Sequence, residues 1–376
     1  MYPVSFNASS PAQDVIDIPN KVRFIVIGAG LIGPRHANHV QQRNDTELVA
    51  IIDHSLKGPA VAKSLGVRLF KNLEEFFHYC DSNYVSYPDA AIVATPNHTH
   101  IDMGLKLAAK KINILMEKPL APTPKDCKVI IDYCNQQKVK LLIGHHRRFN
   151  PYIVATKENL DRLGNLIAIQ GTWSLRKPQL YFDEKPWRSS KELGGGTLLI
   201  NLIHDLDLLQ YLIGPIVKVY AELLPKQRSS SNSSEDSDKL VDEGASLTLR
   251  FANGCCGTFI CSDNVTSPFS FEVGTGENPT IPFNDSIQGI YRIFGSEGTL
   301  SLPDLKLYHQ QNLPPNLEKP KPFDLQLDHF IKLLKNEETT CKCSGEDALS
   351  ALLVINAVIE SIDTGLPQYV QAVDDV

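Results

Sequence analysis

Residues 21–147 alternate between two hydrophobic patterns. Five short, nearly continuous apolar runs are typical of strands buried on both faces of a parallel sheet: VRFIVIG, ELVAIID, DAAIVAT, KINILM and VKLLIG. Longer segments between them place apolar residues three and four positions apart, as amphipathic helices do: GPAVAKSLG, NLEEFFHYC, THIDMGLKLAAKK and TPKDCKVIIDYCNQQK. Strands that alternate with helices predict an α/β domain with a doubly wound parallel sheet covered by helices.

Residues 148–376 have a different pattern and predict a second, α+β domain with an open, mainly antiparallel sheet. Three segments read as strands joined by tight turns: SLTLRF, CGTFICSD and YRIFGSEGTLSL. One apolar helix follows a glycine triplet, and two more end the chain as DLQLDHFIKLLKN and GEDALSALLVINAVIESIDTG. Residues 1–20 are expected to form a flexible N-terminal arm. The serine-rich segment 227–240 has too few apolar residues for a core and predicts a disordered loop.

Composition narrows the possible partners. The 376 residues carry a net charge of −6 with no long Lys/Arg run, which argues against nucleic acid and anionic membrane as partners. No run of 18 apolar residues and no signal peptide is evident, so we expect a cytoplasmic protein. The eight cysteines show no paired spacing typical of zinc ligands, so no metal site is predicted. A small-molecule ligand fits these properties better.

The strand VRFIVIG runs directly into a glycine-rich loop, Gly28-x-Gly30-x-x-Gly33, and then into a helix. This order is typical of a dinucleotide site, in which the first glycine allows a tight turn and the second admits the pyrophosphate. The loop residues expected to contact the cofactor are Gly28, Gly30, Leu31, Ile32 and Gly33.

Asp53 ends the second strand, where a carboxylate would bind a ribose 2′-hydroxyl. A carboxylate repels a 2′-phosphate, so Asp53 favours NAD over NADP. Lys57 and Arg68 lie close enough in sequence to keep NADP open.

Two more segments follow strands at the carboxyl edge, where open α/β sheets bind ligands. In ATPNHTH, Thr95 and Asn97 offer short polar groups, and His100 either faces the cofactor or has a packing role. In EKP, Glu117 could hold a ribose or the neighbouring Lys118. A lysine at this edge can lose solvation and approach a pKa suited to proton transfer.

The ordered set of motifs resembles the glucose–fructose oxidoreductase/inositol dehydrogenase/MocA family, from about Lys21 to about Val370. The matching motifs are IGAGLIGPRH, VATPNHTH, EKPLA, RRFNP, a WR…GGG stretch and IHDLD. The resemblance implies a Rossmann domain followed by an open-sheet domain that commonly makes subunit contacts. It also implies that Lys118 is an acid/base or substrate-polarising group beside the nicotinamide.

His204 matches the family's catalytic histidine on the helix after the glycine triplet. The family usually places an aspartate four residues earlier, and this chain has Ile200 there. Asn201, three residues before His204, can share its helix face and is the expected substitute for substrate binding. Asp205 is a further candidate of lower rank, because adjacent helical residues diverge by about 100°.

Three other residues are candidates for substrate binding. Arg148 and Asn150, in RRFNP, could bind hydroxyl or carboxylate oxygens. Trp187 could cover a sugar ring or the nicotinamide. The alternative roles are a solvated arginine pair and packing at the domain hinge.

The expected function is transfer of a hydride between NAD(P) and a secondary alcohol or ketone of a sugar, cyclitol or related polyol. Lys118 and His204 would serve as acid/base and oxygen-polarising groups, and which does which stays open. The alternatives are a non-catalytic NAD(P)-binding sensor of the same fold, an NAD-dependent glycosidase and a dihydrodiol dehydrogenase. A homodimer or homotetramer through the second sheet is expected.

Overall fold

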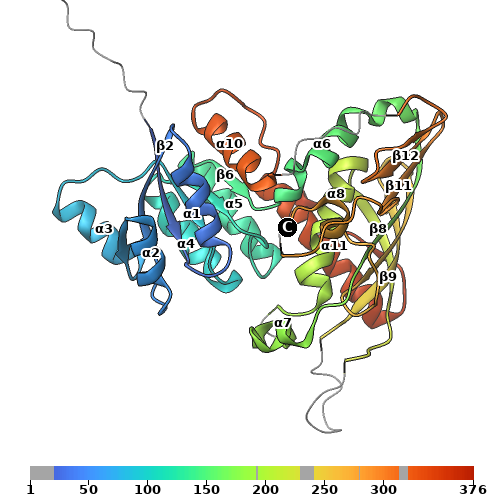
Figure 1. Cartoon of the computed structure of the whole chain (residues 1–376), viewed down its shortest axis with the longest axis horizontal. Helices are drawn as coiled ribbons and strands as arrows, with labels where there is room; N and C mark the ends of the chain where they lie inside the picture. Colours follow the sequence, from blue (N-terminus) through green and yellow to red (C-terminus); the bar gives the residue numbers. More distant parts are fainter. Residues whose placement is uncertain (1–20, 192–193, 229–240, 279, 313–320) are drawn as a thin grey trace, which may run out of the picture.

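The computed structural model describes residues 21–191, 194–228, 241–278, 280–312 and 321–376. Figure 1 shows two domains side by side, with the parallel sheet in one and a larger sheet in the other. The expected arm, residues 1–20, and residues 229–240 of the serine-rich segment lie outside the described residues. Gln227 and Arg228, at the start of that segment, are described, and their backbone N–H groups each donate to the Glu243 carboxylate at 2.8 Å.

The first domain contains a six-stranded, all-parallel sheet in the order β3-β2-β1-β4-β5-β6, which confirms the predicted Rossmann topology. Its strands are β1 (Val22–Ile27), β2 (Thr46–Ile52), β3 (Arg68–Phe70), β4 (Ala90–Val93), β5 (Asn113–Met116) and β6 (Leu141–Ile143). The sequence pattern missed β3, which begins with the charged residue Arg68, whereas the equally short β6 lies within the apolar run VKLLIG.

Helices cover both faces of this sheet because alternate residues of each buried strand point to opposite sides. Ile25 and Ile27 of β1 pack against one group of helices, α3 (Leu73–Ser82), α4 (His100–Ala109) and α5 (Pro124–Gln137). Phe24 and Val26 pack against the other group, α1 (Gly33–Gln42), α2 (Gly58–Leu65) and α10 (Pro322–Leu334). Although α10 comes late in the chain, it therefore completes the core of the first domain. The sequence pattern had placed this helix in the second domain.

The second domain is built on an eight-stranded sheet in the order β13-β12-β11-β7-β10-β9-β8-β14. Its strands are β7 (Leu166–Ser174), β8 (Ile216–Leu223), β9 (Gly244–Phe251), β10 (Cys256–Ser262), β11 (Tyr291–Gly295), β12 (Thr299–Leu302), β13 (Leu307–Tyr308) and β14 (Gln368–Tyr369). All neighbours pair antiparallel except β7 and β10, which confirms the mainly antiparallel sheet.

Helices α8 (Ile203–Ile213) and α11 (Gly345–Thr364) cover the inner face of this sheet. The shorter helices are α6 (Pro151–Glu158), α7 (Gln179–Asp183) and α9 (Phe271–Thr275). On the outer face, the exposed positions of β9 and β10 carry one large apolar residue, Ile260, beside Ser246, Thr248, Arg250, Cys256 and Thr258.

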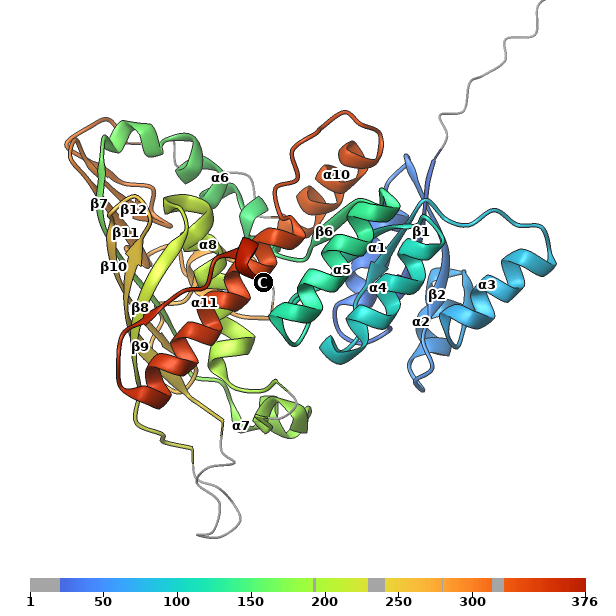
Figure 2. The same ribbon diagram turned by 180° about the vertical axis from the view of Figure 1, so that it is seen from behind.

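Helix α11 belongs to the cores of both domains. Leu349 and Leu352 pack with the first domain, and Val354 and Val358 pack with the second sheet. Figure 2 shows the helix running between the two domains. None of the helices among the described residues combines the length and apolarity needed to cross a membrane.

Candidate active site at the domain junction

The glycine loop after β1 has the geometry that a dinucleotide requires. Gly28 has φ of +102°, and a Cβ there would lie 2.4 Å from the Ala94 carbonyl oxygen. A Cβ on Gly33 would lie 1.8 Å from the Gly28 oxygen, so strand and helix approach too closely for any side chain. At Gly30 a Cβ would meet no atom within 4 Å, which leaves the backbone open to a ligand. The loop therefore fits the pyrophosphate of NAD.

Asp53 lies beside this loop at the end of β2. Its Oδ2 accepts a hydrogen bond from the Ala29 N–H at 2.5 Å, and its Oδ1 accepts one from the Ser55 N–H at 2.6 Å. Burial raises the pKa of Asp53, but hydrogen bonds from the Ser55 side chain and from the Ala29 and Ser55 N–H groups outweigh it, so the pKa lies below its usual value. The ionised carboxylate fits the ribose-binding role predicted for it.

Glu117 is held by the first helix of the Rossmann domain. Its Oε1 lies 2.8 Å from Nε2 of His36 on α1, and Oε2 accepts the Lys118 N–H at 3.4 Å. His36 is 1% exposed, so this contact is internal. The structure thus brings Glu117 to Lys118, and it uses His36, which the sequence pattern did not single out, to orient the carboxylate.

His100, Thr95 and Asn97 shape the loop after β4. His100 is fully buried, and its two ring nitrogens lie 2.9 Å from the carbonyl oxygens of Pro119 and Thr95. It therefore ties this loop to the EKP segment. Thr95 Oγ1 lies 2.6 Å from Thr99 Oγ1, and a Cβ on Gly194 would lie 3.8 Å from Asn97 Nδ2, so Asn97 reaches the glycine triplet of the second domain.

Lys118 points from the end of β5 toward the second domain. Its Nζ donates to the backbone carbonyl of Ile200 at 3.1 Å. Residues Leu198–Leu202 form a π-helical turn before α8. Such turns shift the backbone hydrogen-bonding pattern and often occur at functional sites. At the position where the family's aspartate is missing, a main-chain oxygen therefore receives the lysine.

Burial lowers the pKa of Lys118 to about 8. Glu117 opposes this shift, and the positive charges of Arg147 and Lys177 add to it. A lysine in this range exists in both protonation states near neutral pH, as an acid/base group must.

His204 lies on the first turn of α8 and is 8% exposed. Its ring meets those of His145 and His146 edge-on, at centroid distances of 6.2 and 5.6 Å. Burial, followed by the charges of Lys118 and Arg147, holds the pKa of His204 well below its usual value. His204 is therefore a neutral imidazole at pH 7.

Lys177 is a second lysine at the same turn, and the sequence reading missed it. Its Nζ donates to Asn201 Oδ1 at 2.6 Å and lies 3.5 Å from Asp263 Oδ2. Lys177 follows β7 and precedes a proline, just as Lys118 follows β5 and precedes Pro119. Because β7 was not predicted and Lys-Pro pairs also occur at residues 185–186 and 321–322, no local signal in the sequence singled out Lys177. The amide predicted to bind substrate is thus oriented by a lysine.

Three predicted substrate ligands are not brought to Lys118 and His204 as free polar groups. Arg148, 4% exposed, donates to both oxygens of Asp207 at 2.6 and 3.0 Å. Asn150 caps α6 through its Oδ1 and donates to Glu277 at 3.2 Å. The Asp205 carboxylate accepts from the Tyr291 hydroxyl. These side chains form a buried polar network. The helix-face geometry had already ranked Asp205 below His204 as a substrate ligand.

Asp205 is the carboxyl group of this network whose pKa is shifted most. Burial raises the pKa of Asp205 to about 7, against the opposing charge of Arg147. Trp187, in contrast, is 38% exposed in the short helical turn Pro186–Ser189, where it retains a free surface.

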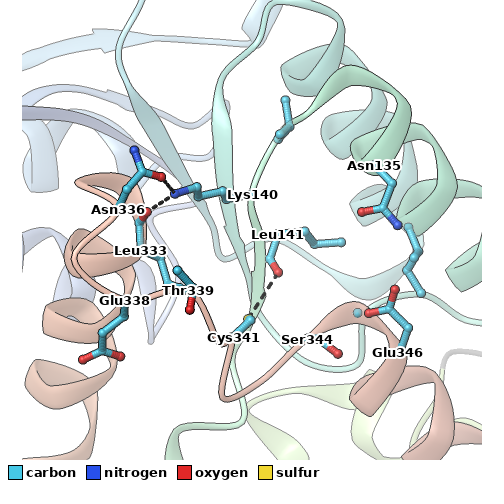
Figure 3. Close-up of a pocket in the computed structure, with 13 residues that line it drawn as sticks. Asn135, Lys140, Leu141, Leu333, Asn336, Glu338, Thr339, Cys341, Ser344 and Glu346 are labelled. Atoms are coloured by element: carbon cyan, nitrogen blue, oxygen red, sulfur yellow. Dashed lines mark hydrogen bonds between the residues drawn. The ribbon is translucent and has the colours of Figure 1, made fainter.

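A surface hollow lies away from this site, between the start of β6, the end of α5 and the segment joining α10 to α11 (Figure 3). Lys140 donates there to Asn336 Oδ1 at 2.6 Å and to the Leu333 carbonyl. None of the predicted site residues lines it. Within the described ranges, no group of three or more His, Cys, Asp or Glu side chains could hold a metal ion.

A parallel sheet with this glycine loop, joined to a second, mainly antiparallel domain whose π-helical turn accepts a hydrogen bond from Lys118, defines a two-domain, dinucleotide-binding protein of the dehydrogenase type. Two family models match the chain. The Oxidoreductase family with an NAD-binding Rossmann fold matches residues 22–145, and the GFO/IDH/MocA C-terminal domain matches residues 157–301. The chain therefore belongs to the GFO/IDH/MocA oxidoreductase family, as the motifs predicted, and its first domain is an NAD-binding domain.

Similar proteins support this assignment. An uncharacterized oxidoreductase of Streptococcus pneumoniae serotype 4 is 29% identical over 198 residues, about half of each chain (51% and 50%). The scyllo-inositol 2-dehydrogenase (NAD(+)) of Bacillus subtilis is 26% identical over 93% of this chain and 96% of its own. The WlbA dehydrogenase of Bordetella pertussis, solved with NADH and UDP-GlcNAcA, superposes with a TM-score of 0.74 at 23% identity, over 94% of this chain and 99% of that one. This last likeness shows the fold.

Proposed function

We propose that this protein is an NAD-dependent oxidoreductase that interconverts a secondary alcohol and a ketone on a sugar, cyclitol or related polyol. The observation that carries the proposal is the position of Lys118, a lysine with a pKa of about 8 that reaches from the carboxyl edge of the first sheet to the turn that precedes His204. NAD, when bound, supplies the hydride acceptor in one direction and the hydride donor in the other. The B. subtilis relative named as an inositol dehydrogenase supports the choice of a polyol.

The two candidate catalytic groups, Lys118 and His204, have different roles because they differ in protonation. Lys118 in its neutral form takes the hydroxyl proton during oxidation, and in its ammonium form returns a proton to the carbonyl oxygen during reduction. His204 stays neutral, because burial disfavours its charged form and a further positive charge beside Lys118 and Arg147 is costly. It therefore serves as a hydrogen-bonding group for a substrate oxygen rather than as the proton carrier.

Asn201 completes the proposed substrate site. Its Oδ1 already accepts from Lys177, so its Nδ2 is the group left to donate to a substrate oxygen. This arrangement supports a hydroxylated substrate, since each contact offers a hydrogen bond and none offers an apolar surface.

The test is nicotinamide absorbance at 340 nm with a panel of inositols, hexoses and sugar acids. Turnover that is abolished in Lys118→Met and retained in Lys125→Met, an exposed lysine, would support the proposal. Tight NADH binding without turnover across the panel would contradict it and favour the sensor. Release of an aglycone with no net change in NADH would favour the glycosidase.

A further inference from the structure

His145 is a buried histidine for which the proposed chemistry has no use so far. It follows β6 directly, is 1% exposed, and neither of its ring nitrogens has a hydrogen-bond partner among the described residues. Its Nδ1 lies 3.6 Å from Asp207 Oδ2, slightly beyond hydrogen-bonding distance. Buried polar groups are nearly always paired, so an unpaired imidazole in a core calls for an explanation.

The explanation is suggested by the neighbouring ring. His204 Nδ1 is also buried and unpaired within the described part of the chain. The two rings lie perpendicular, at 87°, with their centroids 6.2 Å apart. Unpaired nitrogens on two adjacent buried rings can satisfy each other through a small rotation or through one bridging water.

The position of Asp207 indicates which of the two imidazoles donates the hydrogen bond and which accepts it. Both carboxylate oxygens of Asp207 accept hydrogen bonds from Arg148, so the Asp207 carboxylate is held in one orientation. An anion 3.6 Å from His145 Nδ1 favours the proton on that nitrogen and leaves a lone pair on His145 Nε2. That lone pair is the acceptor available to His204.

We propose that His145 is a positioning residue: its Nε2 accepts the Nδ1–H of His204 and thereby fixes His204 as the tautomer with a lone pair on Nε2. His204 then accepts a hydrogen bond from a substrate hydroxyl other than the one whose proton passes to Lys118. The proposal rests on the proposed function for its catalytic meaning. It deepens that function by specifying that the substrate presents a hydroxyl group, rather than only a bare carbonyl, to His204.

The charged groups around His204 are compatible with this tautomer. Lys118, Arg147, His146 and His145 face the ring, and all of them disfavour a doubly protonated His204. Glu277 lies 3.7 Å from His146 Nε2, so the His146 ring is directed to a different carboxylate. His146 thus has a partner of its own, whereas the His145 ring has the Asp207 carboxylate at 3.6 Å and no hydrogen-bond partner among the described residues.

The direct test is the tautomer of His204, read from imidazole ¹⁵N chemical shifts of the full-length, histidine-labelled protein at pH 7.5. We expect a protonated Nδ1 and an unprotonated Nε2 in the wild type. In His145→Phe, which keeps the ring volume and removes both nitrogens, we expect the protonated Nε2 form to appear. His145→Gln, whose amide can accept from His204 and donate to Asp207, should restore the wild-type shifts.

Kinetics give a second readout. His145→Phe should lower kcat for polyol oxidation by at least about tenfold, while the midpoint of the pH profile, set by Lys118, stays near 8. His145→Gln should recover most of this loss. His329→Gln removes a different buried histidine, one that lies beside Glu338, and controls for the general effect of such a change on thermal stability.

A protonated Nε2 in wild-type His204, or shifts unchanged in His145→Phe, would overturn the inference. The tautomer measurement needs no turnover, so it remains decisive even if the substrate panel shows no activity. Absence of turnover in the wild type contradicts the proposed function, whereas a normal rate in folded His145→Phe contradicts only the role of His145.

Discussion

The pH dependence of turnover is the sharpest consequence of the buried lysine. With a pKa of about 8, Lys118 is about 24% neutral at pH 7.5, compared with about 0.1% for a lysine at the ordinary value of 10.5. The buried position therefore enlarges the population of the base form about 240-fold at that pH. Between pH 7.5 and 8.5 the neutral fraction rises about threefold.

The two reaction directions should respond with opposite signs. Polyol oxidation needs neutral Lys118, so kcat/KM should rise with pH and level off above about 8. Ketone reduction needs the ammonium form, so its rate should fall through the same pH. Both are measured at 340 nm under saturating NAD or NADH, in buffers of constant ionic strength.

Variants isolate the lysine as the titrating group. Lys118→Arg keeps a positive charge but cannot lose its proton, so oxidation should fall by at least about 100-fold and lose its dependence on pH near 8. Lys125→Arg, at an exposed position, should leave the profile unchanged. A wild-type profile that is flat from pH 7 to 9, or a midpoint that persists in Lys118→Arg, would refute the assignment.

Three further predictions concern cofactor, stability and assembly. Gly30→Ala meets no protein atom within 4 Å, so we expect an unchanged melting temperature but NADH affinity at least about tenfold weaker by fluorescence titration; equal affinity would place the pyrophosphate elsewhere. Arg148→Met leaves Asp207 buried without its partner and should cost about 3–5 kcal/mol in urea unfolding, whereas exposed Arg176→Met should stay within about 0.5 kcal/mol; equal losses would contradict the internal role of Arg148. Ile260, 48% exposed on the outer face of the second sheet, should lie in the expected subunit interface, so Ile260→Glu should lower the mass measured by light scattering, and an unchanged oligomer would exclude that face.

The Rossmann half was predictable because its signals are local. Each buried strand is a continuous apolar run, and the glycine loop, Asp53 and Lys118 each follow a strand end within a few residues. Parallel strands bring their carboxyl ends to one edge, so sequence order alone placed these residues together. Strands β7 and β8 were not predicted, because their apolar and polar residues alternate only weakly. Several of their positions are half-buried, so the period of two is not distinct.

The rest of the site depends on contacts between distant residues, which no local pattern encodes. The carbonyl of Ile200 accepts a hydrogen bond from Lys118 because the backbone forms a π-helical turn there. The isoleucine side chain gives no indication of that contact. Lys177 reaches Asn201 only through the fold of the second domain. Arg148 looked available to a ligand because Asp207, its partner, lies 59 residues further along the chain.

The shared packing of α11 has a consequence for how such a protein can change over time. Leu349 and Leu352 contribute to one hydrophobic core and Val354 and Val358 to the next, within three turns of a single helix. A gene fusion that kept residues 21–147 and replaced everything after them would remove both α10 and the start of α11 from the first core. The cofactor-binding half is thus not a portable module, because its hydrophobic core includes side chains from two helices near the end of the chain.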